Sequence, residues 1–207
     1  AEYEIPFRVA HKSDATIVSY GFGMGVDSRA INVDLSATGT RFLWTFRKQE
    51  YKVTLQTSGR HNILNALACL TLGALRGFDP EACIAALKTF DGVKRRQEIY
   101  GHKNGITLID DFAHHPTAVR ETLSAIRARF PNARLVACFE PRSATSRRKI
   151  FQQAYGESFD LADLIFIAKP FEPAKQPNTL PNPDVFSTED LLGDLEQRGK
   201  RAKILAT

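Results

Sequence analysis

The order of apolar patterns after residue 104 constrains the fold of this chain more than any other feature. Short apolar runs, typical of buried strands, alternate with segments in which apolar residues recur at helical spacing. We expect, in order, a strand at 105–110, a helix at 117–130, a strand at 134–139, a helix at 145–155, a strand at 164–168, a helix at 188–198 and a strand at 203–205. This alternation predicts an α/β domain with a mainly parallel sheet and right-handed crossovers. The proline-containing segment 170–184 is expected to be a long loop of that domain.

The first part of the chain has a different pattern. Strand-like segments separated by turn signals fill residues 15–56, which predicts a small, mainly antiparallel sheet. The glycine-rich run 20–27 is interpreted as one of its turns. Helical spacing follows at 60–76 and 79–89, and the polar segment 90–96 is a candidate hinge. The chain of 207 residues is therefore expected to contain two domains, 1–90 and 91–207.

Composition narrows the class of protein. No apolar run is long enough to span a bilayer and no signal-peptide pattern is present, so we expect a cytoplasmic protein without a membrane partner. Cys69, Cys83 and Cys138 are scattered in apolar runs, which predicts buried free thiols. The net charge of +5 is compatible with nucleic acid, but the basic residues are dispersed and lack interleaved aromatic residues. Small anionic substrates explain the charge at least as well, and no nucleic-acid partner is expected.

The segment 109–116, IDDFAHHP, follows the first apolar strand of the α/β pattern. It places Asp110, Asp111, His114 and His115 within six positions, where ligands bind in open α/β sheets. Capping of a helix explains one aspartate, but four ionisable groups favour a functional site. The residue types also suit a metal ion. Because adjacent histidines rarely point the same way, we expect no dedicated metal site.

Three segments of the sequence resemble motifs of a known protein family. GRHNILNALA at 59–68, FDGVKRRQE at 90–98 and the segment 109–116 together resemble the Mur ligases, the ATP-dependent amide ligases that build the peptide of the bacterial cell wall. The resemblance runs from about residue 15 to the end of the sequence. It implies that 1–90 is the C-terminal portion of a central ATPase domain, a small β-sheet plus helices. It also implies that 91–207 is a Rossmann-like C-terminal domain.

A fourth segment narrows the resemblance. The segment CFEPRSATSRR at 138–148 resembles the motif of one family member, which attaches the tripeptide L-alanyl-γ-D-glutamyl-meso-diaminopimelate to UDP-N-acetylmuramate in murein recycling. The alanine-adding member has a motif that looks like FQPHRYTR at this place. The implied partners are thus UDP-N-acetylmuramate and the murein tripeptide. The alternatives are the alanine-adding ligase and a non-catalytic module that binds nucleotide or precursor.

The phosphate loop of the family, G-x-x-G-K-[ST], does not occur in this sequence. The chain therefore resembles part of a larger enzyme, and alone it is expected to be inactive. ATP and Mg²⁺ are the implied cofactors, with the Mg²⁺ ligands mainly outside this chain.

The resemblance also assigns nucleotide-binding residues. Asn62 and Asn65 lie one helical turn apart, and amides suit an adenine edge, with Asn65 as the implied adenine residue. The alternative is that His61 and Asn62 only cap the helix. Arg96 is implied to bind and neutralise the γ-phosphate, because a guanidinium matches phosphate oxygens, and Asp111 to accept from the ribose hydroxyls.

Substrate-side residues are expected beyond the strand end. An imidazole titrates near neutrality, so His114 is a candidate for orienting or deprotonating the incoming amine. Arg142, Arg147 and Arg148 are candidates for the substrate carboxylates, and Arg142 is the best of them because it lies on the turn after Pro141.

Overall fold

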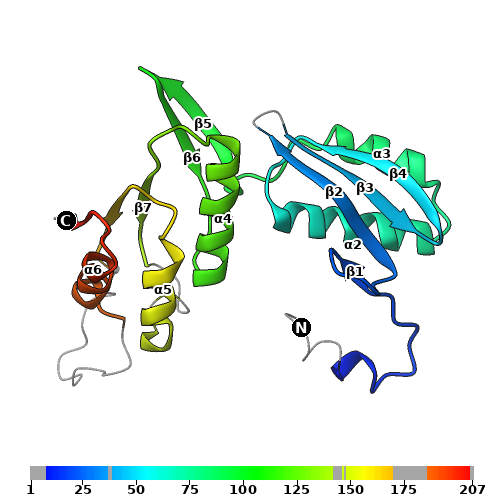
Figure 1. Ribbon diagram of the computed structural model, residues 1–207, viewed down its shortest axis with the longest axis horizontal. Helices are drawn as coiled ribbons and strands as arrows, with labels where there is room; N and C mark the ends of the chain where they lie inside the picture. Colours follow the sequence, from blue (N-terminus) through cyan, green and yellow to red (C-terminus); the bar gives the residue numbers. More distant parts are fainter. Residues whose placement is uncertain (1–7, 37–38, 142–145, 147, 170–185, 206–207) are drawn as a thin grey trace. The chain divides into compact units, whose positions relative to one another are not determined.

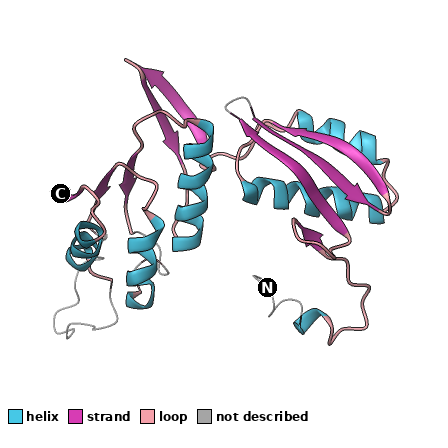
Figure 2. Cartoon of the chain, viewed as in Figure 1, coloured by secondary structure: helices cyan, strands magenta, loops and turns pink. Residues whose placement is uncertain are grey.

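The computed structural model describes residues 8–36, 39–141, 146, 148–169 and 186–205. The chain divides into two compact units, 1–90 and 91–207. Figure 1 traces the chain through both units, and Figure 2 distinguishes their helices and strands.

In its described residues, the first unit has a four-stranded sheet, two long helices and a short helical segment at 8–10. Its elements are β1 (Tyr20–Gly21), β2 (Ser28–Ser36), β3 (Gly39–Phe46), β4 (Gln49–Leu55), α2 (Arg60–Leu75) and α3 (Pro80–Lys88). The strands follow the order β1-β2-β3-β4; β1 pairs in parallel with β2, and the other pairs are antiparallel. Both helices lie on one face of this sheet (Figure 2). The expected small antiparallel sheet and both expected helices are therefore present.

A buried polar chain links the sheet of the first unit to α2. The indole of Trp44 is fully buried, and its Nε1 donates to Ser28 Oγ over 2.8 Å. The hydroxyl of Thr71 on α2 lies 2.6 Å from Ser28 Oγ and 2.5 Å from the carbonyl oxygen of Leu67. The buried polar side chains of Trp44, Ser28 and Thr71 thus have hydrogen-bond partners, which avoids the cost of an unsatisfied group in an apolar core.

The second unit contains two sheets and three longer helices. Its elements are β5 (Glu98–Lys103), β6 (Ile106–Asp110), α4 (Pro116–Arg129), β7 (Val136–Phe139), the 3-10 helix η1 (Lys149–Phe151), α5 (Gln152–Ser158), β8 (Leu164–Ile167), α6 (Thr188–Gln197) and β9 (Ala202–Ile204). Strands β7, β8 and β9 form the parallel sheet in that order, whereas β5 and β6 form an antiparallel hairpin. The α/β class with a parallel sheet is confirmed.

In this unit one strand was missed and the start of one helix was predicted wrongly. Strand β5 was not expected; it forms because Glu98 to Lys103 pair with β6 across the turn at Asn104–Gly105, where both residues have positive φ. Helix α5 begins at Gln152 rather than near 145, after the 3-10 turn. The expected loop 170–184 lies outside the described residues.

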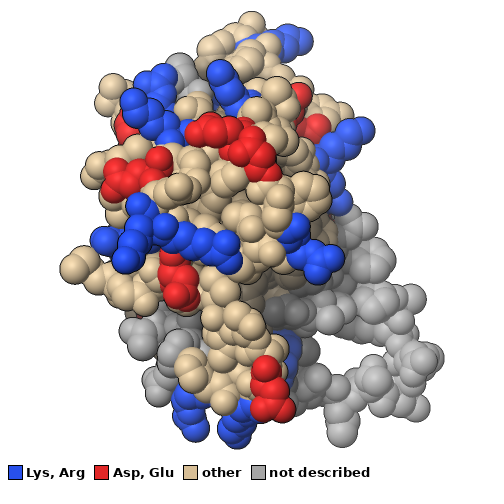
Figure 3. Space-filling model, turned by 90° about the vertical axis from the view of Figure 1, so that its right-hand side faces the viewer, with Lys and Arg blue, Asp and Glu red and all other residues tan. Residues whose placement is uncertain are grey.

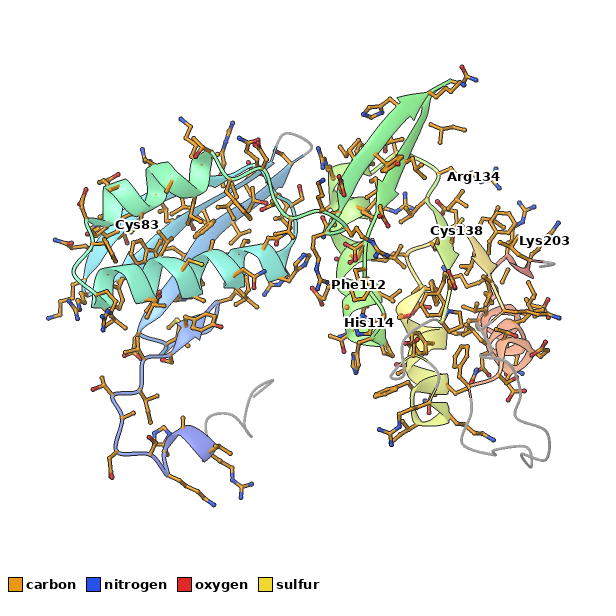
Figure 4. All side chains as sticks on the ribbon, turned by 180° about the vertical axis from the view of Figure 1, so that it is seen from behind. Cys83, Phe112, His114, Arg134, Cys138 and Lys203 are labelled. Atoms are coloured by element: carbon orange, nitrogen blue, oxygen red, sulfur yellow. The ribbon has the colours of Figure 1, made fainter. Side chains whose placement is uncertain are left out.

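The core of the second unit lies on one side of the parallel sheet. Phe139, Ile165 and Ile167 are buried with residues of the helices, including Leu123 of α4, Tyr155 of α5 and Leu191 of α6. On β7 the alternate residue Cys138 is exposed (Figure 4). The prediction of buried thiols was therefore wrong: Cys69 and Cys138 are exposed free thiols and Cys83 is half-buried.

Candidate functional site

The start of α2 carries the two asparagines that the sequence singled out. The N-cap residue Gly59 has φ 105°, and no side chain caps the helix from that position. Asn62 is half-buried and its Nδ2 donates to the carbonyl oxygen of Ser58 over 2.8 Å. Asn65, one turn later, is exposed. The two amides therefore differ: Asn62 holds the chain that enters the helix, and Asn65 faces solvent.

An aromatic contact lies beside the same helix start. The guanidinium of Arg60 stacks over the ring of Phe22 at 3.9 Å, and Phe22 accepts a 3.0 Å hydrogen bond on its carbonyl oxygen from Arg29 Nε. The first turn of α2 has no acidic side chain. Positive side chains and helix N–H groups thus dominate this end of α2.

In the second unit, Asp111 organises the segment after β6. Its Oδ2 accepts from the backbone N of Gln97 over 2.8 Å, and its Oδ1 accepts from the backbone N of Ala113 over 2.7 Å. Each carboxylate oxygen has two lone pairs, so each keeps one for a ligand. Asp111 therefore connects the segment that contains Arg95 and Arg96 to the segment that contains His114.

The two arginines of this segment lie near one aromatic ring. Their guanidinium carbons are 5.1 Å (Arg95) and 5.8 Å (Arg96) from the ring centroid of Phe112. Arg95 also pairs with Asp110 at 3.5 Å, and its carbonyl oxygen accepts from the backbone N of Phe112 over 2.8 Å. This ion pair gives Asp110 a partner within the same segment of the second unit. Both arginines are exposed.

The histidines that follow are fixed by backbone contacts. Figure 4 shows Phe112 and His114 in the segment that leads from β6 into α4. His114 Nδ1 lies 3.0 Å from the carbonyl oxygen of Phe112, and the two rings meet edge to face at 5.0 Å. His115 is the N-cap of α4, where its Nδ1 accepts from the backbone N of Thr117 over 3.3 Å.

Sequence reasoning missed one residue that supports this segment. Tyr155 of α5 is fully buried, and its hydroxyl donates to the carbonyl oxygen of His114. Burial raises the pKa of Tyr155 to about 12, so the hydroxyl stays protonated as a donor. Tyr155 and His114 are 41 positions apart in the sequence, and no local sequence pattern predicts a contact between them.

The arginines expected at the substrate carboxylates are only partly described. Arg148 is exposed and directly precedes η1. Arg142 and Arg147 lie outside the described residues, so their expected roles stay predictions.

Charged side chains of both signs lie on the surface of the molecule. Lys and Arg side chains are interspersed with Asp and Glu on the face that Figure 3 displays, without a continuous basic surface. Within the described ranges, no group of three or more His, Cys, Asp or Glu side chains is placed to hold a metal ion. No helix in the described part of the chain is long and apolar enough to cross a membrane.

Comparison with known proteins gives two family matches. The family described as Mur ligase, glutamate ligase domain, matches residues 95–205, and the Mur ligase middle domain matches residues 3–73. A curated relative, the UDP-N-acetylmuramate–L-alanine ligase of Desulfitobacterium hafniense, is 33% identical over 204 residues, which are 98% of this chain and 44% of the relative. The chain thus spans less than half the length of this relative.

Solved structures give the same fold. A UDP-N-acetylmuramate-alanine ligase from Thermotoga maritima superposes with a TM-score of 0.76 and 24% identity, over 96% of this chain and 40% of that one, a likeness of fold alone. A murein peptide ligase from Psychrobacter arcticus superposes with a TM-score of 0.60 and 27% identity, over 91% of this chain and 38% of that one.

Proposed function

Because the chain belongs to the Mur ligase family, we propose that it is part of an ATP-dependent ligase that joins an amino substrate to UDP-N-acetylmuramate. The observation that supports this most is the Asp111 carboxylate, which connects the segments of Arg96 and His114 at the end of β6. Ligands of open α/β sheets bind at such strand ends. We also propose that residues 1–90 and 91–207 are the end of a central ATPase domain and a C-terminal domain.

The chemistry requires activation of a carboxylate. ATP converts the acid of UDP-N-acetylmuramate into an acyl phosphate, and the amino substrate then displaces phosphate to form the amide. Catalysis of such a transfer rests on positioning and on neutralising the phosphoryl charge. We assign the γ-phosphate to Arg96, whose guanidinium is exposed and lies beside Phe112. Because the reaction consumes ATP, we expect it in the cytoplasm.

Nucleotide recognition is assigned to two further residues. Asn65 is exposed and offers both a donor and an acceptor for an adenine edge, whereas Asn62 is engaged by Ser58. Asp111 keeps one free lone pair on each oxygen, which suits two ribose hydroxyls. The phosphate loop and the Mg²⁺ ligands are expected in the rest of the ligase, so we expect this chain alone not to hydrolyse ATP.

The amino substrate has two candidates. The relative from D. hafniense favours L-alanine. The segment 138–148, with the likeness to a murein peptide ligase, favours the tripeptide as the second candidate. A tripeptide that ends in γ-D-glutamyl-meso-diaminopimelate has several carboxylates where alanine has one, and Arg142, Arg147 and Arg148 can match them.

A competition assay distinguishes these substrates. The complete ligase is offered equal amounts of L-alanine and tripeptide with ATP and UDP-N-acetylmuramate, and the products are separated by mass. Preference for L-alanine supports the first candidate. Preference for tripeptide supports the second, and Arg142→Ala should then reduce tripeptide use roughly thirtyfold, about 2 kcal/mol for one lost bidentate pair. Ligation of neither substrate contradicts the proposed function.

A further inference from the structure

Two adjacent imidazoles, His114 and His115, face backbone groups of opposite kinds. Nδ1 of His114 lies 3.0 Å from a carbonyl oxygen, that of Phe112. Nδ1 of His115 lies 3.3 Å from an amide nitrogen, that of Thr117. A carbonyl oxygen only accepts a hydrogen bond and an amide N–H only donates one. The two Nδ1 atoms must therefore differ in whether they carry hydrogen.

These partners determine the tautomer of each neutral ring. A neutral imidazole has one N–H, and the hydrogen bond of one nitrogen decides the state of the other. His114 carries its hydrogen on Nδ1, which leaves a lone pair on Nε2. His115 has its lone pair on Nδ1, which places the hydrogen on Nε2. No hydrogen bond to either Nε2 is found among the described residues.

The surrounding contacts hold this arrangement. The hydroxyl of Tyr155 donates to the carbonyl oxygen of His114, and Asp111 accepts from the backbone N of Ala113. The ring of His115 packs edge to face on Phe151 at 4.8 Å, within the range of favourable aromatic pairs. A ring flip at either histidine would exchange a hydrogen-bonding nitrogen for a carbon, so each orientation is favoured by its own bond.

We infer that His114 is the proton acceptor for the amino substrate, through Nε2, and that His115 is held in the opposite tautomer and does not take that proton. This rests on the proposed function. Nε2 of His115 already carries hydrogen, and a proton on its Nδ1 would abolish the bond that caps α4. Only His114 of this pair offers a lone pair that no backbone group uses.

The proposed step balances. The ammonium group of the amino substrate gives one proton to Nε2 of His114, and the resulting amine attacks the acyl phosphate carbon. The carbon–nitrogen bond forms and the carbon–oxygen bond to the phosphoryl group breaks. The second proton lost as the nitrogen becomes an amide leaves with inorganic phosphate. One imidazolium, one amide and one hydrogen phosphate are the products.

The tautomers can be observed directly. In ¹⁵N-labelled chain above the titration range of histidine, long-range ¹H–¹⁵N correlation spectra distinguish protonated from unprotonated ring nitrogens. His114→Asn and His115→Asn assign the signals by loss of one ring each. We expect a protonated Nδ1 in His114 and a protonated Nε2 in His115. The same tautomer in both rings, or the reverse pair, overturns the inference.

Kinetics of the complete ligase test the proton transfer with the same variants. Asn at position 114 keeps a donor for the Phe112 carbonyl but accepts no proton, so ligation should fall about a hundredfold, a typical contribution of general base catalysis. Asn at position 115 still caps α4, and ligation should stay within about threefold of the wild type.

Hydroxylamine separates failure of this inference from failure of the proposed function. It is uncharged near neutral pH and intercepts an acyl phosphate as a hydroxamate without needing a base. We expect His114→Asn to form hydroxamate at the wild-type rate while ligation is lost. Absence of hydroxamate with the wild-type ligase contradicts the proposed function. Normal ligation by His114→Asn, with hydroxamate present, overturns the role of His114 alone.

Discussion

The start of α2 and the segment between β6 and α4 use polar residues in a comparable way. In each, one side chain fixes the backbone and a near neighbour in sequence faces outwards. Asn62 donates to the carbonyl of Ser58 while Asn65 is exposed. His115 caps α4, while Nε2 of His114 is left for a ligand. A motif of several polar residues is therefore partly structural in both regions.

The regions differ in what holds them. At α2 the fixing bond is local, four residues apart in sequence. The β6–α4 segment is held by Asp111, bonded to Gln97, and by Tyr155, 41 residues away from His114. Loss of one residue should therefore affect the helix start modestly, whereas the segment after β6 depends on bonds that bring distant parts of the chain together.

The largest effect is expected for a ligand-facing residue of the second region. In the complete ligase, Arg96→Ala should lower kcat about a hundredfold with little change in the KM for ATP. The reason is that the guanidinium stabilises the charge of the phosphoryl group more in the transition state than in the ground state. Steady-state kinetics at varied ATP measure both quantities. Lys94→Ala, an exposed neighbour, is the matched control and should stay near wild type. A change in KM alone would show that Arg96 binds the ground state only.

Asp111→Ala should have the second largest effect. It removes the acceptor of two backbone amides, those of Gln97 and Ala113, which should cost about 2 kcal/mol because half-buried donors lose their partners. Urea unfolding of the chain, followed by amide signals of the second unit, measures this. Asp111→Asn keeps one acceptor oxygen and should lose about half as much. Equal stability of the wild type and the two Asp111 variants would show that the hydrogen bonds of Asp111 do not stabilise this segment.

Much of the fold was predictable because its signals are local. Apolar periodicity located α2, and Pro80 and Pro116 marked the starts of α3 and α4. Strand β5 was missed because Glu98 to Lys103 carry no continuous apolar run, and the strand depends on pairing with β6. The exposure of Cys138 was missed because residue type alone does not say which face of the sheet the helices cover.

The site was predictable only in its residue types. The spacing of Asp111, His114 and His115 indicated a cluster, but not that backbone amides occupy one lone pair on each oxygen of Asp111. The choice between ring nitrogens depends on contacts at 3.0 and 3.3 Å that a one-dimensional pattern does not contain. Tyr155 was missed for the same reason.

A smaller effect tests whether Asn62 stabilises the start of α2 while Asn65 binds nucleotide. Asn62→Ala should reduce the free energy of unfolding by about 1 kcal/mol, the usual cost of a lost bond at a helix start. Asn65→Ala, on the exposed side, should leave stability within about 0.5 kcal/mol and instead raise the KM for ATP of the complete ligase. Thermal or urea unfolding of both variants measures the change in the free energy of unfolding. Equal destabilisation by the two variants would show that the amides are not divided in this way.

The smallest effect concerns Asp163, which directly precedes β8. Like Asp111, it accepts a hydrogen bond from a backbone N–H group. Its pKa is lowered, chiefly by the hydrogen bond from the backbone N of Leu135 and then by that from Arg127. A lowered pKa in the folded state means that ionised Asp163 contributes stability above the ordinary pKa of an aspartate. This contribution is lost as pH falls through the lower, folded-state value.

Asp163→Asn should therefore be slightly less stable than the wild type at pH 7, and the difference should shrink in acid. Urea unfolding across that pH range measures it, with Asp190→Asn on the exposed start of α6 as the control. A difference that stays constant with pH would mean that the hydrogen bonds of Asp163 do not depend on the charge of its carboxylate.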